Sequence, residues 1–186
     1  MPIIMKVEVQ ASQANRLINS GNVVMVSCAH QDRSSIITIA WHCPVSFKPP
    51  ALAIAVGKSR FSAELIQKSG EFVVNIPDWN LFDAMLYCGT RSGRDEDKFA
   101  GAKLTPEKAV KLLRAPKIRE CIGAIECSLI DRVEVGDHYL FLGEVVYAEV
   151  EEELWTDGSW KPETAQLIYH LGGSRFMKPG PVSEVS

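Results

Sequence analysis

The sequence has no excess of positive charge and no long apolar run. Its formal net charge is −3 at pH 7, so it offers no general electrostatic attraction to nucleic acid or to an anionic membrane surface. No stretch approaches the ~20 apolar residues that a membrane-spanning helix needs. Residues 1–6 have no basic region ahead of an apolar core, which argues against a signal peptide. We therefore expect a cytoplasmic protein without nucleic-acid or membrane partners.

Motifs for metals and dinucleotides are also missing. The five cysteines are scattered, and none forms a Cys-X-X-Cys pair, which excludes a zinc ribbon and a thioredoxin-type couple and fits a reducing compartment. Neither His-X-His nor His-Glu-X-X-His occurs, so we expect no metal site. Because Gly-X-Gly-X-X-Gly is absent, a Rossmann site for a nicotinamide cofactor is not supported.

What is present is an ordinary globular composition. Apolar residues make up 46% and charged residues 23% of the 186 residues, which fits a single domain spanning residues 1–186. Periodicity predicts helices over residues 61–70 and 78–89, with Asp78 as the N-cap of the second, a short turn capped by Asp95, and weak helical potential over residues 107–113. Period-two and β-branched runs predict strands over residues 23–30, 36–41, 51–56, 71–76, 122–133, 138–150 and 166–171, with a turn at Asp157-Gly158 between the last two.

Many short strands with two or three inserted helices favour a particular architecture. Exposed sheet edges are a liability, and closing a sheet on itself removes them. A doubly wound sheet would need regular alternation of strand and helix, which this sequence lacks. We therefore predict a mainly β fold, a β-barrel with inserted helices.

Residues 35–46 are a candidate ligand-binding stretch. They alternate polar and apolar positions, and a small residue such as Ala40 allows a backbone to approach a planar ring closely. From spacing alone, however, an ordinary amphipathic strand with Trp41 in the core is the better interpretation. Cys43 and Cys88 are similarly interpreted as small buried hydrophobic residues rather than redox groups.

Three further segments carry polar groups that could serve a ligand. Ser59 and Arg60 open a predicted helix, where free N–H groups and a guanidinium suit a phosphate, although simple capping by Ser59 is the more ordinary interpretation. The loop of residues 90–98 holds three basic side chains beside three acids, and could equally be a solvated loop. His138, after Gly136-Asp137, could assist proton transfer or bond a turn carbonyl.

In combination, these segments resemble the flavin reductase-like, flavoredoxin-type branch of the FMN-binding split-barrel family. The likeness covers about residues 17–176, and its strength is that the pieces occur in the family's order. The pieces are Thr-Ile-Ala-Trp at residues 38–41 followed by Pro-Val-Ser and Pro-Pro, Lys-Ser-Arg at 58–60, Gly-Glu-Phe-Val-Val-Asn at 70–75, Tyr-Cys-Gly at 87–89, Ser-Gly-Arg-Asp-Glu-Asp-Lys-Phe at 92–99, Glu-Cys at 126–127, Gly-Asp-His at 136–138, Leu-Gly-Glu-Val at 142–145, and Leu-Ile-Tyr with Leu-Gly-Gly at 167–173.

The resemblance implies a six-stranded split β-barrel that forms a homodimer and binds FMN noncovalently near the subunit interface. His138 would be the catalytic residue, on the donor side of the flavin. The cofactor-binding residues would be Thr38, Ile39, Ala40, Trp41, Cys43 and Ser46 around the ring, and Ser59, Arg60, Phe61, Ser62, Ser92 and Lys98 around the phosphate.

Two positions depart from the family's pattern. Ser35 stands where the family often has Asn before the first flavin strand, which puts a side-chain amide contact with the ring in doubt. Phe176 stands where a final Tyr is expected, which removes one hydroxyl.

The implied activity is that of an FMN-dependent oxidoreductase of the flavin reductase or flavoredoxin type. NAD(P)H is the expected donor, and a flavin, iron or a redox protein partner is the acceptor. Three alternatives stay open: an iron–sulfur protein as donor, a non-catalytic FMN carrier or sensor, and a structural split barrel without flavin.

Overall fold

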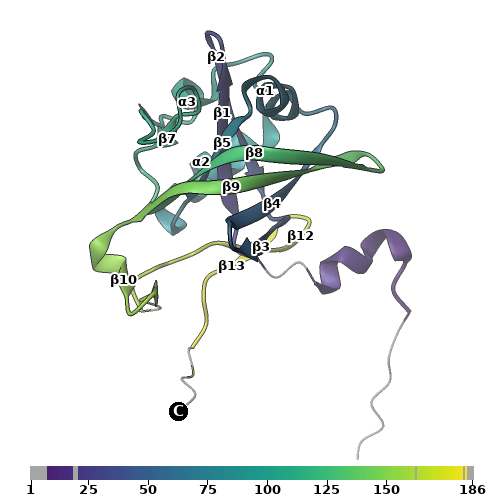
Figure 1. The fold of residues 1–186 in the computed structure, drawn as a ribbon. Coiled ribbons are helices and arrows are strands. Elements are labelled where there is room, and N and C mark those ends of the chain that lie inside the picture. The colour runs from purple at the N-terminus through teal and green to yellow at the C-terminus, as the bar shows by residue number, and fades with distance from the viewer. Residues whose placement is uncertain (1–7, 19–20, 162, 182, 184–186) are drawn as a thin grey trace, which may run out of the picture.

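The computed structural model of the chain describes residues 8–18, 21–161, 163–181 and 183 (Figure 1). Residues 1–6, the basis for expecting no signal peptide, lie outside this described part. Its main feature is one seven-stranded antiparallel sheet. In sheet order the strands are β2 (Arg33–Ile39), β1 (Val24–His30), β5 (Glu71–Ile76), β8 (Gly123–Val135), β9 (His138–Val150), β4 (Pro50–Gly57) and β3 (His42–Phe47).

The two edges of this sheet are joined by a very short connection. β2 and β3 stand at opposite ends of the strand order, yet only Ala40 and Trp41 separate them in the chain. The Trp41 carbonyl also accepts a hydrogen bond of 2.9 Å from the Ala55 amide of β4. Such a short link can connect the two edges only if the sheet curls round, which gives the expected mainly β barrel.

Residues 35–46 thus form two strands, where a single extended segment was expected. The chain leaves β2 after Ile39 and starts β3 at His42, pairing with β4 from His42↔Ile54 onward. The main sheet therefore has seven strands instead of six. Polar and apolar positions alternate through residues 35–46, so no local pattern marks the change of pairing partner.

The barrel core follows the alternation of the strands. On β1, Val24, Val26 and Cys28 belong to a cluster with α1 (Phe61–Ser69) and the inner face of the sheet. The intervening Met25 faces α2 (Phe82–Thr90) and α3 (Lys98–Gly101) in a second cluster. β1 is therefore buried on both faces, which explains its continuous apolar run.

Several helix boundaries differ from those expected. Asp78 does act as an N-cap, accepting from the Asn80 amide at 2.9 Å, but it opens a single 3₁₀ turn, η2 (Trp79–Leu81), ahead of α2. Helix α2 continues one residue past Gly89 to Thr90. Asp97, and not Asp95, caps α3 by accepting from the Phe99 and Ala100 amides.

The prediction of weak helical potential over residues 107–113 is wrong. The segment is irregular between β6 (Pro106–Glu107) and β7 (Lys117–Ile118). The fully buried Glu126 carboxylate of β8 accepts from the amides of Val110 at 2.6 Å, Lys111 at 2.7 Å and Leu112 at 3.2 Å. Glu71 of β5 accepts from the next three amides, at 2.8–3.3 Å. Carboxylates from the sheet thus satisfy donors that a helix would have used.

The remaining elements lie towards the ends of the chain. The expected strand over residues 166–171 is shorter, and it pairs with a strand that was not expected. The turn at Asp157-Gly158 is confirmed, since both residues have positive φ. The elements are η1 (Ala11–Leu17), η3 (Glu152–Leu154), β10 (Trp155–Thr156), β11 (Ser159–Trp160), β12 (Tyr169–Gly172) and β13 (Arg175–Met177). Figure 1 shows η1 and the tip of the β8–β9 hairpin extending away from the barrel. Across the described residues, every helix is too short or too polar to cross a bilayer.

The Glu126 contacts lead to a stability prediction. Glu126→Gln keeps the side-chain shape but places an NH₂ group against backbone N–H donors and removes the charge that strengthens the bonds. We expect the free energy of unfolding, measured in urea, to fall by about 2 kcal/mol. Glu144→Gln, on the exposed side of β9, is the matched control and should have little effect. Equal stability of the two variants would contradict this account.

Candidate functional site

Two adjoining cavities lie along β2. The first, the Trp41 cavity, has a volume of about 220 Å³. The second, the Lys98 cavity, is smaller, at about 90 Å³. Ile37 and Arg60 line both cavities, so the two are neighbours. Together they form an extended site whose two ends have different chemistry.

The Trp41 cavity is a flat-walled hollow with basic groups at its margin. β4 and β9 meet β2 there, through the pair Gly57↔His138. The rings of Trp41 and His138 have centroids 5.2 Å apart and are tilted by 35°. Trp41 is 44% exposed, so the interpretation that it lies in the core is wrong. The cavity is lined by Ile37, Thr38, Ile39, Ala40, Trp41, Ala55, Val56, Gly57, Arg60, His138 and His170.

His138 is oriented by its neighbour. Its Nδ1 lies 2.7 Å from the exposed Asp137 carboxylate. This hydrogen bond from His138 lowers the pKa of Asp137 below its usual value. The backbone carbonyl of Asp137 also accepts from the Lys58 amide at 2.9 Å, which ties the β8–β9 turn to the segment before α1. Asp137 therefore positions the imidazole beside Trp41 through its carboxylate, while its backbone carbonyl fixes the turn against the segment before α1.

The Thr38 hydroxyl hydrogen is used in a hydrogen bond within the protein, so Thr38 contributes to the cavity mainly through its position on β2. Its Oγ1 donates to the carbonyl of Met85 in α2 at 2.7 Å. The hydroxyl thus fastens β2 to α2 and retains only acceptor capacity. Ala40 has no side chain beyond Cβ, so the wall next to Trp41 consists largely of strand backbone.

The Lys98 cavity is cationic and rich in hydroxyl groups. Lys98 is 5% exposed, and its ammonium donates to the carbonyls of Ile36 at 2.7 Å and Cys88 at 2.6 Å. Burial lowers the pKa of Lys98. An ammonium has three donors, so one remains for a ligand. The cavity is lined by Ser35, Ile37, Ser59, Arg60, Phe61, Ser62, Cys88, Gly89, Arg91, Ser92, Gly93 and Lys98.

Ser35 and Arg60 bring polar side chains to the Lys98 cavity. Ser35 is 1% exposed, and its hydroxyl has no hydrogen-bond partner within the described part of the chain. A buried hydroxyl without a partner is costly unless a ligand or water satisfies it. Arg60 is the N-cap of α1 by backbone position, with no side-chain capping bond, so the interpretation that Ser59 simply caps the helix is wrong.

The Lys98 cavity fits a phosphate group. A phosphate dianion takes hydrogen bonds from hydroxyls, charged side chains and the N-terminus of a helix. Ser35, Ser59, Ser62, Arg60 and Lys98 supply these donors around one small space at the start of α1. The Trp41 ring and the neighbouring backbone in the wall of the Trp41 cavity suit a planar ring joined to such a phosphate.

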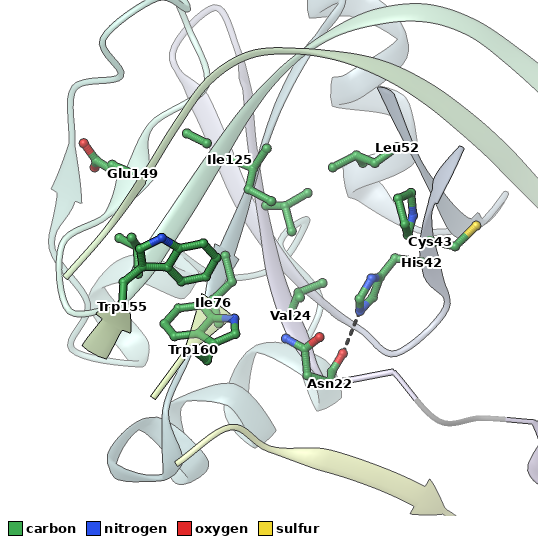
Figure 2. Close-up of a pocket in the computed structure, with 14 residues that line it drawn as sticks. Asn22, Val24, His42, Cys43, Leu52, Ile76, Ile125, Glu149, Trp155 and Trp160 are labelled. Atoms are coloured by element: carbon green, nitrogen blue, oxygen red, sulfur yellow. Dashed lines mark hydrogen bonds between the residues drawn. The ribbon is translucent and has the colours of Figure 1, made fainter. Parts of the chain in front are cut away.

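Two of the residues expected around the ring lie elsewhere. Ser46 lines neither cavity. Cys43 is exposed on β3, contrary to its interpretation as a buried residue. It borders a third, apolar cavity of about 540 Å³ (Figure 2). There His42 Nε2 lies 2.6 Å from the Asn22 carbonyl, across the gap between β3 and the start of β1. Trp155 and Trp160 form the far side of this cavity.

The other cysteines are buried thiols. Burial raises the pKa of Cys28 to about 12, of Cys88 to about 11 and of Cys127 to about 12. At neutral pH these groups are protonated and poor nucleophiles. Among the described residues, no three His, Cys, Asp or Glu side chains gather as metal ligands would.

Sequence reasoning missed several lining residues. Ala55 to Gly57 follow from the pairing of β4 with β9, which one sequence does not reveal. Ser35 opens the candidate stretch of residues 35–46, but its burial beside the phosphate donors does not follow from the sequence. His170 enters the Trp41 cavity from β12, near the end of the chain, and no local pattern points to it.

A curled antiparallel sheet with a cationic, hydroxyl-rich cavity beside a cavity walled by Trp41 fits the split-barrel class of proteins. Comparison with known proteins agrees. A family model described as flavin reductase like domain matches residues 16–176. This chain belongs to the flavin reductase-like family.

Individual relatives are similar along almost the whole chain. An uncharacterized protein, YddH, of Escherichia coli is 32% identical over 180 residues, covering 94% of this chain and 95% of the relative. Flavoredoxin of Desulfovibrio vulgaris has a similar structure, with a TM-score of 0.83, 26% identity, and coverage of 100% and 97% of the two chains. An FMN-binding domain of a flavin reductases-like enzyme from Shewanella baltica gives a TM-score of 0.81, 26% identity and 96% coverage of both chains. These structures confirm the split-barrel fold.

Proposed function

We propose that this protein binds FMN noncovalently and acts as an oxidoreductase of the flavin reductase or flavoredoxin type. One observation carries the proposal: a cationic, hydroxyl-rich cavity with an unsatisfied buried Ser35 directly adjoins a flat cavity walled by Trp41. Family membership supports it, as does the likeness to a flavoredoxin and to an FMN-binding domain.

In this proposal, the phosphate of FMN lies in the Lys98 cavity and its ring lies in the Trp41 cavity. Lys98, Arg60 and the serine hydroxyls hold the phosphate. The backbone of residues 38–40, at the end of β2 and in the link to β3, covers the ring together with Trp41. Bound FMN would supply the redox chemistry, taking a hydride equivalent from a donor and passing electrons on. The protein positions the ring and favours negative charge on it through nearby cations.

His138 is placed to serve the donor side. Its imidazole lies beside Trp41 at the margin of the cavity and is half-buried, so a small molecule can reach it. Oriented by Asp137, it can hold or deliver a proton near the ring or bind a polar group of the donor. NAD(P)H is the proposed donor, and a flavin, iron or a redox protein is the proposed acceptor.

The visible spectrum of the purified protein, before and after anaerobic addition of NADH and NADPH in turn, tests the activity. We expect flavin absorbance bands that bleach with one donor or both. His138→Gln should slow bleaching by about 100-fold while FMN affinity changes little. Tight flavin binding without reduction by either donor would indicate a carrier, and a colourless protein that cannot be reconstituted would indicate a structural barrel.

The phosphate contacts generate a second prediction. Arg60→Ala and Lys98→Ala should each weaken FMN binding by about 1.5–3 kcal/mol, roughly a 10- to 150-fold rise in Kd, through loss of charge-assisted hydrogen bonds. Riboflavin, which lacks the phosphate, should bind both variants as it binds the parent protein. Arg119→Ala, at an exposed arginine that pairs with Glu107, is the matched control. Unchanged FMN affinity in both cavity variants would refute the phosphate assignment.

We further propose that the protein is a homodimer. The apolar cavity of Figure 2 borders the edge strand β3, where Phe47 is 96% exposed and Val45 50% exposed. An exposed apolar patch next to an apolar cavity favours association. A further hollow on this side shares Ala40, Trp41 and Ala55 with the Trp41 cavity, so a second copy seated here would border the flavin site.

Sedimentation equilibrium tests the dimer. We expect a mass about twice the 20.6 kDa of one chain. Phe47→Glu should shift the equilibrium towards monomer because it introduces a charge into a buried contact. Leu113→Glu, at a position that is 83% exposed in the segment of residues 103–120, is the control and should leave the mass unchanged. A monomeric parent protein at micromolar concentration would refute the proposal.

A further inference from the structure

The apolar cavity of Figure 2 lies at an end of the barrel interior, and its lining residues are all different from those of the Trp41 and Lys98 cavities. Val74 of β5, Ile125 of β8 and Ala148 of β9 are paired directly across neighbouring strands, so their side chains share one face of the sheet. Val74 also pairs with Val26, a member of the barrel core. The floor of the cavity is therefore the inner face of the barrel.

The exposure of these three residues shows that the interior is open here. Val74 is 3% exposed, Ile125 is half-buried and Ala148 is exposed, although all three face inwards. The apolar core thus stops short of this end of the barrel. The cavity has a volume of about 540 Å³. Pockets for small molecules have volumes of roughly 300–1,000 Å³ and occur in the mouths of β-barrels.

Two tryptophans form the wall opposite β3. Trp155 of β10 pairs with Trp160 of β11, and their ring centroids lie 5.5 Å apart with the planes at 88°. The Trp160 ring packs on Gly123 of β8, where an added Cβ would lie only 3.3 Å from it. Trp155 is 39% exposed. A flat aromatic molecule can stack on one indole and meet the edge of the other, and both arrangements are favourable.

The lining offers no ion-pair partner for a charged ligand. Lysine and arginine are both missing from it in the described part of the chain. Its one carboxylate, that of Glu149, pairs with the buried Lys117 and accepts from the Tyr147 hydroxyl at 3.1 Å. Figure 2 shows this carboxylate directed away from the two indoles. A charged ligand would lose its hydration here without compensation, so the cavity favours a neutral one.

His42 on β3 supplies a hydrogen-bonding group at the cavity. Its Nε2 lies 2.6 Å from the Asn22 carbonyl, which can only accept, so Nε2 carries the proton. In the neutral ring, Nδ1 is then an acceptor. A hydroxyl group on the ligand is the matching donor.

We propose that the apolar cavity is a second ligand site, which binds a neutral molecule of two fused aromatic rings carrying a hydroxyl group. This site is independent of the proposed FMN function, because it shares no lining residue with the flavin cavities among the described residues. It is also separate from the contact proposed for a second copy. Phe47 and Val45 lie on the exposed side of β3, whereas the cavity floor faces the barrel interior.

Isothermal titration calorimetry of the full-length protein with 1-naphthol tests the proposal, in the absence of FMN and with FMN at saturation. We expect one naphthol per chain, with the same Kd in both conditions. 1-Naphthoate has the same rings but carries a carboxylate, so it should bind at least about tenfold more weakly.

Two variants locate the bound naphthol. Ala148→Phe places a ring in the cavity mouth and should raise the Kd at least about tenfold, because the space is then occupied. Trp160→Leu removes one aromatic wall and should raise the Kd about 3- to 10-fold. Ala100→Phe, at an exposed position of α3, is the matched control and should leave the Kd unchanged.

The contrary outcomes are distinct. Absence of binding at about 1 mM naphthol overturns the proposal, and so does displacement of naphthol by FMN, which would place it in the Trp41 cavity. Binding only in Phe47→Glu would show that a second copy fills the cavity, and this also overturns the proposal. Should Ala148→Phe not fold, Trp160→Leu and 1-naphthoate still decide. A protein that binds naphthol but no FMN would refute the proposed function and leave this inference standing.

Discussion

A buried ammonium group is the interaction on which the candidate site depends. Lys98 begins α3, and its side chain donates to a carbonyl of β2 and a carbonyl of α2. It thereby fixes three elements around one point. In the described part of the chain, no carboxylate forms an ion pair with it, although Glu96 attracts it more weakly, and burying an uncompensated charge is unfavourable. The fold accepts this cost where the cavity opens, and a bound anion would relieve it.

The coupling between this charge and a ligand follows from the same contacts. Desolvation disfavours the charged form of Lys98, whereas an anion held nearby favours it. A phosphate would therefore stabilise both the ammonium and the packing of α3 against β2. The unsatisfied Ser35 hydroxyl adds to the same effect, because a ligand oxygen would supply its missing partner. The hydrogen bonds that would bind the phosphate would therefore also stabilise the local structure around Lys98.

Some of this arrangement could be predicted from the sequence and some could not. The apolar run of β1 and the change to a helical period at Phe61 are local patterns, and both elements were found in place. The separation of β3 from β2 depends on which strand His42 pairs with, which is a long-range choice. The irregular course of residues 110–112 depends on Glu126, a residue of a distant strand that reads locally as an ordinary strand position.

The residues of the candidate site likewise include some that the sequence predicts and some that it does not. Trp41, Arg60 and Lys98 could be proposed from the order of motifs, because each sits in a recognisable local segment. Ser35 and His170 could not, since their contribution comes from burial and from a hairpin that packs back from the end of the chain.

The short crossing at Ala40 and Trp41 explains why a barrel of this kind can hold an elongated ligand. Where β2 turns into β3, backbone and one large ring form a wall, and the pairing of β4 with β9 brings His138 against it. Towards the other end of the same strand, Ser35 lies in the wall of the Lys98 cavity. One strand therefore lines both cavities. Since a strand rises by about 3.3 Å per residue, the separation between the Trp41 cavity and the Lys98 cavity is set by residue positions along β2.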